Sequence, residues 1–323
     1  MISAVIPVFN EYESLPHFLP ELQKALQKLD KQYEILFIDD GSTDGSLDFL
    51  KKMTQRDKKI KLFSFRKNQG KSEALTLGFQ MAKGEYIVTL DADLQDRPEE
   101  IQTLYKKARE GYDLVCGWRK KRKDPIQKVV SSRLFNFFAS IFWGLQLHDY
   151  NCGLKLYTSD AAKSLRLYGG MHRFIPLLVF GEGFIVTEVA VAHSERAYGK
   201  SKYGFSKLWK DLPDILTMLF LTKYGRRPLH FFGMLGGILS FIGIIVLVYL
   251  SFVHFSGHSI GTRPLLFLGI VLLLAGLQVL VAGFLADLFL NTMTRFSTVD
   301  HATHFRLRYR SDTRSKEEIV IGT

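Results

Sequence analysis

The sequence predicts an α/β protein in which a doubly wound, mostly parallel sheet is followed by a two-helix transmembrane hairpin. In the first part of the chain, short apolar runs that fit buried strands alternate with helical patterns, an order typical of parallel sheets. Further on, Leu229–Phe255 and Leu265–Ala286 contain no Lys, Arg, Asp or Glu. Each stretch exceeds the roughly 20 residues needed to cross the hydrocarbon core of a bilayer. The alternative is a buried helical hairpin in a large soluble core.

The expected strands and helices of the first part each rest on a hydrophobic period. The strands are Ile2–Val8, Tyr33–Ile38, Ile60–Phe65, Tyr86–Leu90 and Asp113–Gly117. The helices are Tyr12–Leu29, a second one that ends near Met53, Ser72–Ala82 and Pro98–Glu110. Polar residues close the first, second and fourth strands. Open α/β sheets bind their ligands just beyond the carboxyl ends of the strands, so a site is expected there.

The domain organisation follows from these elements. Residues 1–204 are expected to form a cytoplasmic α/β domain, in which the aromatic segment 131–146 either lies in the membrane interface or packs in the core. The remaining parts are a juxtamembrane amphipathic helix at 205–228, a transmembrane domain at 229–293 with spans at about 229–255 and 265–290, and a cytoplasmic tail at 294–323. Basic residues flank the hairpin on the side of both chain ends, so the positive-inside rule places both termini in the cytoplasm.

Charge and cysteine usage narrow the functional classes. The net charge of +11 suggests a polyanionic neighbour, and the two spans favour anionic lipid and phosphate ligands over nucleic acid. Cys116 and Cys152 are the only cysteines, which imply no disulfide framework and fit a reducing cytosol. Met1–Phe9 lacks a basic region followed by a long apolar run, so no signal peptide is expected. These features favour an inner-membrane protein whose α/β domain lies in the cytoplasm.

The strongest chemical signal is Asp91-Ala-Asp93 followed by Gln95, directly after the fourth strand. Residues at i, i+2 and i+4 share one face of an extended chain, so these three side chains are expected to converge. Their oxygen atoms suit a hard cation such as Mg²⁺ or Mn²⁺. The competing interpretation is that the two aspartates only cap the helix that follows. No Gly-x-Gly-x-x-Gly follows the first strand and no P-loop is present, so a bound diphosphate would need such a metal for neutralisation.

Several motifs resemble, in order, those of known glycosyltransferases. Those that resemble family 2 glycosyltransferases with the GT-A fold are Pro7–Glu11, Asp39–Asp44, Asn68–Lys71 and Asp91–Gln95. Those that resemble the polyprenyl-phosphate branch are Leu147–Lys155, His172–Ile175 and Arg196–Gly204. That branch includes dolichol-phosphate mannose synthases and bacterial two-span polyprenyl-phosphate glucosyltransferases. Each motif alone is weak, but the ordered set and the hairpin extend the resemblance to about Met293.

The resemblance implies roles for individual residues. The nucleotide-binding positions are Pro7, Phe9, Glu11, Asp39, Asp91, Ala92 and Asp93, and the metal ligands are Asp91, Asp93 and Gln95. The positions that bind the lipid phosphate are Arg119, Arg133, Arg196 and Lys202. The residues that carry catalysis are the three metal ligands together with Arg133 and Arg196. Asp149 is either a general base or a structural residue, and His172 either contacts ligand or is a cap or core residue.

The implied reaction transfers a sugar from a nucleotide-diphosphate sugar, UDP-glucose as the first expectation and a guanosine donor as the alternative, to undecaprenyl or dolichyl phosphate. A lipid phosphate is already anionic near neutral pH, so its oxygen can attack the anomeric carbon without a base. A metal on the donor side and arginines on the acceptor side would offset the repulsion between two phosphorylated substrates. The expected outcome is a metal-dependent displacement with inversion. Oligomerisation through the hairpin is left open.

Competing functions differ in class. A non-catalytic membrane protein that binds lipid or partner proteins through a decayed nucleotide domain is the main alternative, against which the intact acidic and basic residues argue. An aspartate-phosphorylating hydrolase would carry its Asp-x-Asp after the first strand, where this chain has Pro7-Val-Phe-Asn. A processive polysaccharide synthase is disfavoured because the chain has no Gln-x-x-Arg-Trp and only two spans.

Overall fold

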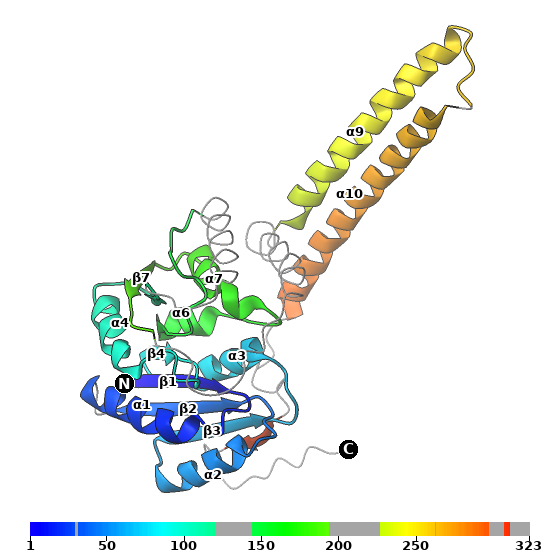
Figure 1. Cartoon of the computed structure of the whole chain (residues 1–323). Helices are drawn as coiled ribbons and strands as arrows, with labels where there is room; N and C mark the ends of the chain where they lie inside the picture. Colours follow the sequence, from blue (N-terminus) through cyan, green and yellow to red (C-terminus); the bar gives the residue numbers. More distant parts are fainter. Residues whose placement is uncertain (30–31, 121–143, 194–226, 262, 297–306, 311–323) are drawn as a thin grey trace. The chain divides into compact units, whose positions relative to one another are not determined.

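A computed structural model of the chain describes residues 1–29, 32–120, 144–193, 227–261, 263–296 and 307–310 (Figure 1). The chain divides into two compact units. One is built on a sheet and the other on two long helices. The segments predicted as an interfacial element, 131–146, and as a juxtamembrane helix, 205–228, lie almost wholly outside the described residues.

The first unit is built on a mixed, mostly parallel sheet with the strand order β7-β5-β6-β4-β1-β2-β3-β8. Its strands are β1 (Ile2–Val8), β2 (Tyr33–Asp39), β3 (Ile60–Phe65), β4 (Tyr86–Thr89), β5 (Leu114–Trp118), β6 (Lys155–Thr158), β7 (Val186–Ala190) and β8 (Leu307–Arg310). β1 pairs in parallel with both β2 and β4, as do β2 with β3 and β5 with β7. The predicted α/β class and mostly parallel sheet are therefore confirmed.

Three strands were not predicted. β6 lies between β4 and β5 and runs antiparallel to both, so the fourth and fifth predicted strands are not neighbours. β7 pairs with β5 at one edge, and β8 pairs antiparallel with β3 at the other. β6 and β8 have only four residues each, too few for a clear hydrophobic period, and their pairing partners are distant in sequence. The tail predicted to follow the hairpin as a separate segment thus contributes a strand to the sheet.

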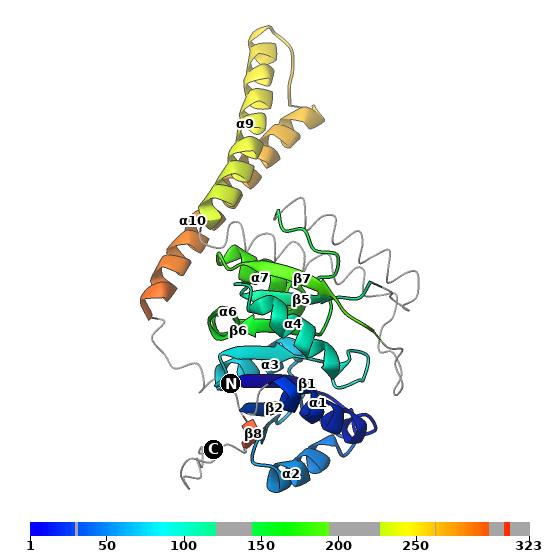
Figure 2. The ribbon, with the colours of Figure 1, turned by 90° about the vertical axis from the view of Figure 1, so that its left-hand side faces the viewer.

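Helices cover both faces of this sheet (Figure 2). The helices of the first unit are α1 (Leu15–Leu29), α2 (Ser46–Arg56), α3 (Lys71–Met81), α4 (Ile101–Ala108), α6 (Ser159–Ser164) and α7 (Ile175–Gly181), with short 3-10 turns at Pro98–Glu100 and Met171–Phe174. One apolar core joins α1, α2 and α4 to alternate residues of β1, including Ile2, Ala4 and Ile6. α3 packs against β1 and β2 from the other face, which makes the sheet doubly wound.

The contact between α3 and β1 depends on a glycine in the helix. A Cβ on Gly78 would lie 2.2 Å from Cγ1 of Val5, closer than any real contact of this kind. Glycine costs helix stability, but here it allows the helix to approach the sheet closely. The packing of α3 against β1 therefore depends on the absence of a side chain at Gly78.

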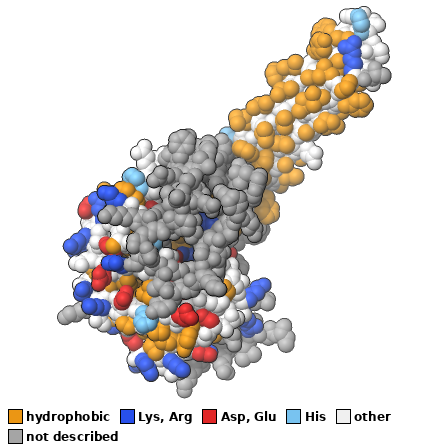
Figure 3. All heavy atoms as spheres, in the orientation of Figure 1, with side chains coloured by type: hydrophobic (Ala, Val, Ile, Leu, Met, Phe, Trp, Pro, Cys, Tyr) orange, Lys and Arg blue, Asp and Glu red, His pale blue; other side chains and the backbone are white. Residues whose placement is uncertain are grey.

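The second unit consists of α9 (Pro228–Phe255) and α10 (Pro264–Phe296). Pro228–Phe255 and Pro264–Leu290 are long and apolar enough to cross a membrane, as predicted. Their surface is largely hydrophobic (Figure 3). The helices approach through glycines: a Cβ on Gly236 would lie 2.5 Å from the carbonyl oxygen of Gly276. Small residues at such a crossing let two backbones pack directly.

The close approach of α3 to β1 generates a stability prediction. Gly78→Ala should lower the free energy of unfolding of the first unit by about 1–3 kcal/mol, because the added methyl group overpacks the contact with Val5. Gly181→Ala is the matched control, since a Cβ there has no neighbour within 4 Å and alanine favours helix. Thermal unfolding of the detergent-solubilised protein measures both. Equal unfolding temperatures for the two variants would contradict the packing explanation.

Candidate active site

The loops that follow β1 and β2 are joined to each other by hydrogen bonds. The backbone N–H of Asn10 donates to Oγ of Ser42 at 2.9 Å, and the N–H of Thr43 donates back to Oδ1 of Asn10 at 2.8 Å. The N–H of Glu11 donates to Oγ of Ser46 at 3.0 Å. Asn10 has a φ of 57°, a conformation that asparagine tolerates better than most residues. The Pro7–Glu11 motif and the Asp39–Asp44 motif thus form one continuous edge.

The loop after β3 joins the same edge through aspartates of the β2 loop. Asp39 is fully buried and accepts hydrogen bonds from the N–H of Ser42 at 3.2 Å and from the hydroxyl of Ser64 at 2.7 Å. Asp40 accepts from the N–H groups of Gln69 at 2.6 Å and Gly70 at 3.0 Å. Burial raises the pKa of Asp40, and these two N–H bonds offset only part of that rise. Asp39, predicted to contact nucleotide, here fixes the loop from within, while Pro7, Phe9 and Glu11 are partly exposed.

The Asp-x-Asp segment is a turn rather than an extended strand. β4 ends at Thr89, and Leu94 has a φ of 60°. The N–H of Gln95 donates to Oδ1 of Asp93 at 3.2 Å, a local bond of the kind by which aspartates favour turns. The expectation that Asp91, Asp93 and Gln95 line one face of an extended chain was wrong. They follow the end of β4 in a turn instead, in which Asp91 and Gln95 are partly exposed and Asp93 is buried.

Asp91 is paired with a lysine that the sequence analysis did not assign a role. Nζ of Lys71, the first residue of α3, lies 2.5 Å from Oδ1 of Asp91. Burial alone would raise the pKa of Asp91, but the positive charge and hydrogen bond of Lys71 outweigh it, so the pKa is lowered. On the other side, a Cβ on Gly153 would lie 2.9 Å from Oδ2 of both Asp91 and Asp96. Only glycine at this position leaves room for the two carboxylates.

His172 adjoins this pair through the N-terminus of α3. The hydroxyl of Ser72 donates to the carbonyl oxygen of Gly169 at 2.7 Å, so it can only accept from the ring of His172, whose Nδ1 is 3.0 Å away. The proton of the ring is therefore on Nδ1. Burial and the nearby charges of Lys71 and Arg173 lower the pKa of His172 to about 3, so the ring is neutral. His172 thus connects the 3-10 turn before α7 to the start of α3 through Ser72, and its side chain caps neither that turn nor α7.

The residues present fit a divalent cation in their donor chemistry. Asp91 and Asp93 supply carboxylate oxygens, and Gln95 supplies an amide oxygen, the ligand types that Mg²⁺ and Mn²⁺ prefer. In the described residues no three His, Cys, Asp or Glu side chains are grouped to hold a metal. Mg²⁺ is commonly held by one or two carboxylates together with substrate phosphates, so two aspartates suffice. Asp91 already pairs with one cation in this structure, the ammonium group of Lys71.

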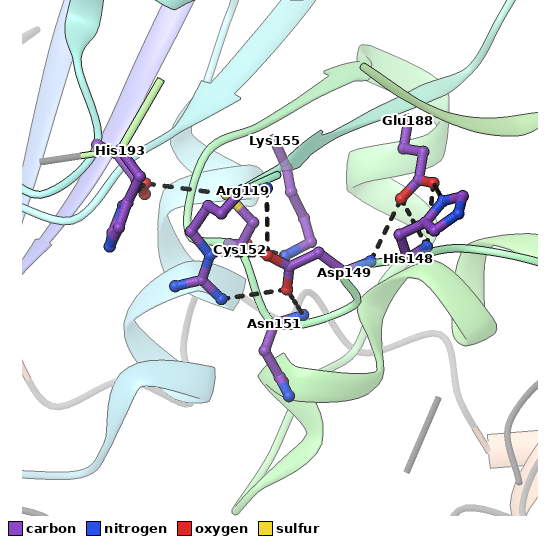
Figure 4. Close-up of polar contacts among 9 residues, drawn as sticks. Arg119, His148, Asp149, Asn151, Cys152, Lys155, Glu188 and His193 are labelled. Carbon is purple, nitrogen blue, oxygen red and sulfur yellow. Dashed lines mark hydrogen bonds and ion pairs between the residues drawn. The ribbon is translucent and has the colours of Figure 1, made fainter. Parts of the chain in front are cut away.

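Arg119 and Asp149 form a buried ion pair on the other side of β6 (Figure 4). Nε of Arg119 donates to Oδ2 of Asp149 at 2.7 Å, and its Nη2 donates to Oδ1 at 3.1 Å. The side chain of Asp149 is 0% exposed and that of Arg119 is 15% exposed. The adjacent carboxylate raises the pKa of Arg119 further above its usual range despite the opposing effect of burial. The carboxylate of Asp149 is thus paired with Arg119, which favours a structural role for Asp149 over a role as general base.

Other predicted site residues have no described position. Arg133, Arg196 and Lys202 lie outside the residues that the structure describes. Lys71, Gly153 and Glu188 were not assigned roles from the sequence. The first two belong to motifs that were recognised, so a signal for them existed. Glu188 lies in a strand that was not predicted, and nothing in the sequence marks it.

The Arg119–Asp149 pair generates a second stability prediction. Asp149→Ala should lower the free energy of unfolding by about 3 kcal/mol, because it leaves a largely buried guanidinium without its counter-charge. Asp48→Ala removes an exposed carboxylate paired with Lys51 and should cost less than about 1 kcal/mol. Replacing both partners, Arg119→Met with Asp149→Leu, should recover much of the loss. Urea unfolding followed by circular dichroism measures all three, and equal losses for the two Asp→Ala variants would refute the role of the pair.

Comparison with known proteins places this geometry in a family. Residues 3–166 match the family described as Glycosyl transferase family 2. The chain is 37% identical over 300 residues to the dodecaprenyl-phosphate galacturonate synthase of Rhizobium johnstonii, covering 91% of this chain and 89% of that protein. It is 32% identical over 290 residues to the undecaprenyl-phosphate 4-deoxy-4-formamido-L-arabinose transferase of Pseudomonas aeruginosa, covering 89% of this chain and 84% of that protein.

Solved structures share the fold of the first unit. The glucosyl-3-phosphoglycerate synthase of Mycobacterium tuberculosis in complex with phosphoglyceric acid superposes with a TM-score of 0.53 at 18% identity, covering 69% of this chain and 79% of that chain. The same enzyme in complex with Mn²⁺ and UDP-glucose gives a TM-score of 0.51 at 17% identity, covering 69% and 78%. The expected GT-A-type fold is confirmed. Because the family match spans half of the chain and the sequence relatives align over about nine-tenths of it, the chain belongs to glycosyltransferase family 2.

Proposed function

We propose that this glycosyltransferase transfers a sugar from a nucleotide-diphosphate sugar to the phosphate of a polyprenyl phosphate at the cytoplasmic face of the inner membrane. The observation that carries the proposal is a site with two charged halves, Asp91 with Lys71 at the end of β4 and Arg119 with Asp149 at the end of β5. Two apolar helices long enough to cross a bilayer follow in the same chain. Both sequence relatives are named for the transfer of a sugar to a polyprenyl phosphate.

On the acceptor side, the chemistry needs a cation and no base. A phosphate monoester is anionic near neutral pH, so its oxygen can attack the anomeric carbon without first losing a proton to a base. The pairing of Asp149 with Arg119 fits this requirement, because Asp149 serves the arginine rather than a proton transfer. The fork to Asp149 uses two of the five N–H groups of the guanidinium, and the others are those we assign to the acceptor phosphate. Arg133, Arg196 and Lys202 are proposed to complete this half.

On the donor side, we propose that Pro7, Phe9, Glu11 and the Asp39 loop surround the base and ribose, and that the Asp91–Gln95 turn receives the diphosphate. Mg²⁺ or Mn²⁺ held by Asp91, Asp93 and Gln95 would neutralise the diphosphate and stabilise it as a leaving group. Lys71 holds the carboxylate of Asp91 ionised, so that it is ready to bind a cation. Mn²⁺ is bound in a structure of a fold relative, which supports a divalent ion in this class of site.

A uridine diphosphate sugar is the proposed donor. UDP-glucose was the expectation from resemblance, and the names of the relatives bring galacturonate and 4-deoxy-4-formamido-L-arabinose into consideration. A non-catalytic lipid-binding protein is disfavoured, since the family is one of enzymes and the acidic turn and its lysine are intact.

The deciding experiment incubates membranes that contain the protein with radiolabelled nucleotide sugars and undecaprenyl phosphate. The donor panel is UDP-glucose, UDP-galacturonate, UDP-4-deoxy-4-formamido-L-arabinose and GDP-mannose. Label should enter the lipid fraction from one uridine donor, and EDTA or Asp93→Ala should reduce the rate at least a hundredfold, since either removes metal-ion stabilisation of the transition state worth several kcal/mol. Asp48→Ala, at an exposed site on α2, is the control. Full turnover with EDTA, or in Asp93→Ala, would exclude the metal site, and no labelled lipid with any donor would exclude the function.

The stereochemistry of the product provides an independent prediction. Direct attack by the acceptor phosphate is a single displacement, so the anomeric configuration of the product should be opposite to that of the donor. NMR of the purified lipid-linked sugar measures it. Retention would show that an enzyme nucleophile intervenes, which the proposed mechanism lacks.

A further inference from the structure

Glu188 of β7 is a charged residue without a role in the reaction as proposed so far, and it bonds the segment that carries Asp149. Its side chain is 12% exposed. Both of its carboxylate oxygens accept from the backbone N–H of His148, at 3.0 and 2.8 Å, and one accepts from the N–H of Asp149 at 3.3 Å (Figure 4). A carboxylate that accepts several N–H groups is held firmly, because charge-assisted hydrogen bonds are the stronger kind.

The imidazole of His148 adds a third connection. Its Nδ1 is hydrogen-bonded to Glu188, and because an ionised carboxylate only accepts, the proton must lie on Nδ1. The ring stacks on Trp118 with centroids 4.2 Å apart and planes 19° from parallel. Trp118 is the last residue of β5, and its carbonyl oxygen accepts from the N–H of Val191 at 3.0 Å. The His148 ring is thus hydrogen-bonded to β7 through Nδ1, and its face is stacked on the last residue of β5.

Two adjacent residue pairs therefore bridge the end of β5 and the segment before β6. Trp118 stacks on His148, and Arg119 pairs with Asp149. Glu188 binds the backbone N–H groups of His148 and Asp149, one residue from each pair. It does so from β7, which pairs with β5 and places Glu188 opposite Cys116. The carboxylate of Asp149 can hold the guanidinium in one place only if its own backbone is fixed. Glu188 supplies that fixed point.

We infer that Glu188 is a positioning residue for the acceptor half of the reaction: by holding His148 and Asp149 against β7, it sets the place of Arg119 for the polyprenyl phosphate. The inference rests on the proposed function, because it takes Arg119 as a contact of the acceptor phosphate. Glu188 itself touches no substrate in this account. Its loss should therefore weaken acceptor binding without changing donor binding.

The test compares Glu188→Gln with Arg119→Ala in steady-state kinetics on the full-length protein in lipid vesicles, with undecaprenyl phosphate and the active nucleotide sugar each varied in turn. Gln keeps the size of Glu but removes its charge and replaces one of its two accepting oxygens by an NH2 group, which cannot accept from the N–H groups of His148 and Asp149. The KM for undecaprenyl phosphate should therefore rise about tenfold. The KM for the nucleotide sugar and the kcat at saturating acceptor should stay within about twofold. Glu21→Gln, an exposed residue of α1, is the matched control for loss of one carboxylate and should leave all constants unchanged.

The double variant Arg119→Ala with Glu188→Gln separates positioning from any other role. If Glu188 acts through Arg119, the double variant should have the same acceptor KM as Arg119→Ala alone, since residues that act as a unit are not additive. Additive losses would overturn the inference, as would an unchanged acceptor KM in Glu188→Gln together with a raised one in Arg119→Ala. An unchanged acceptor KM in Arg119→Ala would instead refute the place of Arg119 in the proposed function.

A second variant covers the case in which Glu188→Gln does not fold. His148→Ala removes the imidazole bond to Glu188 and the stack on Trp118 but leaves the backbone N–H bonds. It should raise the acceptor KM about two- to threefold with the donor KM unchanged, the loss of one modest contact. A fall in the thermal unfolding temperature without any change in the acceptor KM would mean that the bridge is only structural, and would overturn the inference.

Discussion

Pairing of buried charge is the constraint on which this site depends. An ionised carboxylate in a protein interior is costly unless a cation or several N–H groups meet it. At the carboxyl edge of the sheet, Asp39 and Asp40 are met by N–H and hydroxyl donors, Asp91 by Lys71, and Asp149 by Arg119. Each of these bonds joins two segments that are distant in the sequence. The contacts that offset the cost of burying these carboxylates therefore also fix the loops that carry them.

This pairing also bears on the two halves of the proposed site. In the half proposed for the donor, Lys71 holds the pKa of Asp91 low, so the acidic turn carries a positive charge beside it. In the half proposed for the acceptor the order is reversed, since the carboxylate of Asp149 is buried and the guanidinium of Arg119 is partly exposed. A negatively charged donor and a negatively charged acceptor can approach each other only when positive charge is provided for both. β6, inserted between β4 and β5, separates the two halves by one strand.

Much of the sheet could be predicted from the sequence, because runs such as Tyr33–Asp39 are buried throughout and carry a strong local signal. β6 and β8 could not, because their existence depends on partners far along the chain. The Asp91–Gln95 motif was recognised, but its extended geometry was wrong, since the bond between Asp93 and the N–H of Gln95 competes with strand structure. Arg119 was found by resemblance, whereas its pairing with Asp149 and the bond from Glu188 are contacts of tertiary structure that no local pattern records.

The strand β8 has a consequence for the topology of the chain. β8 lies beyond α10 in sequence, yet it pairs with β3 in the sheet that β1 to β7 also build. The two apolar helices are therefore an insertion within one domain rather than an appendage at its end. A sheet cannot be shared across a bilayer. If the two apolar helices cross one, the chain must therefore leave and return on the same side, and the number of crossings between β7 and β8 must be even. Strand pairing thus enforces the parity of the hairpin, independently of where its basic residues fall.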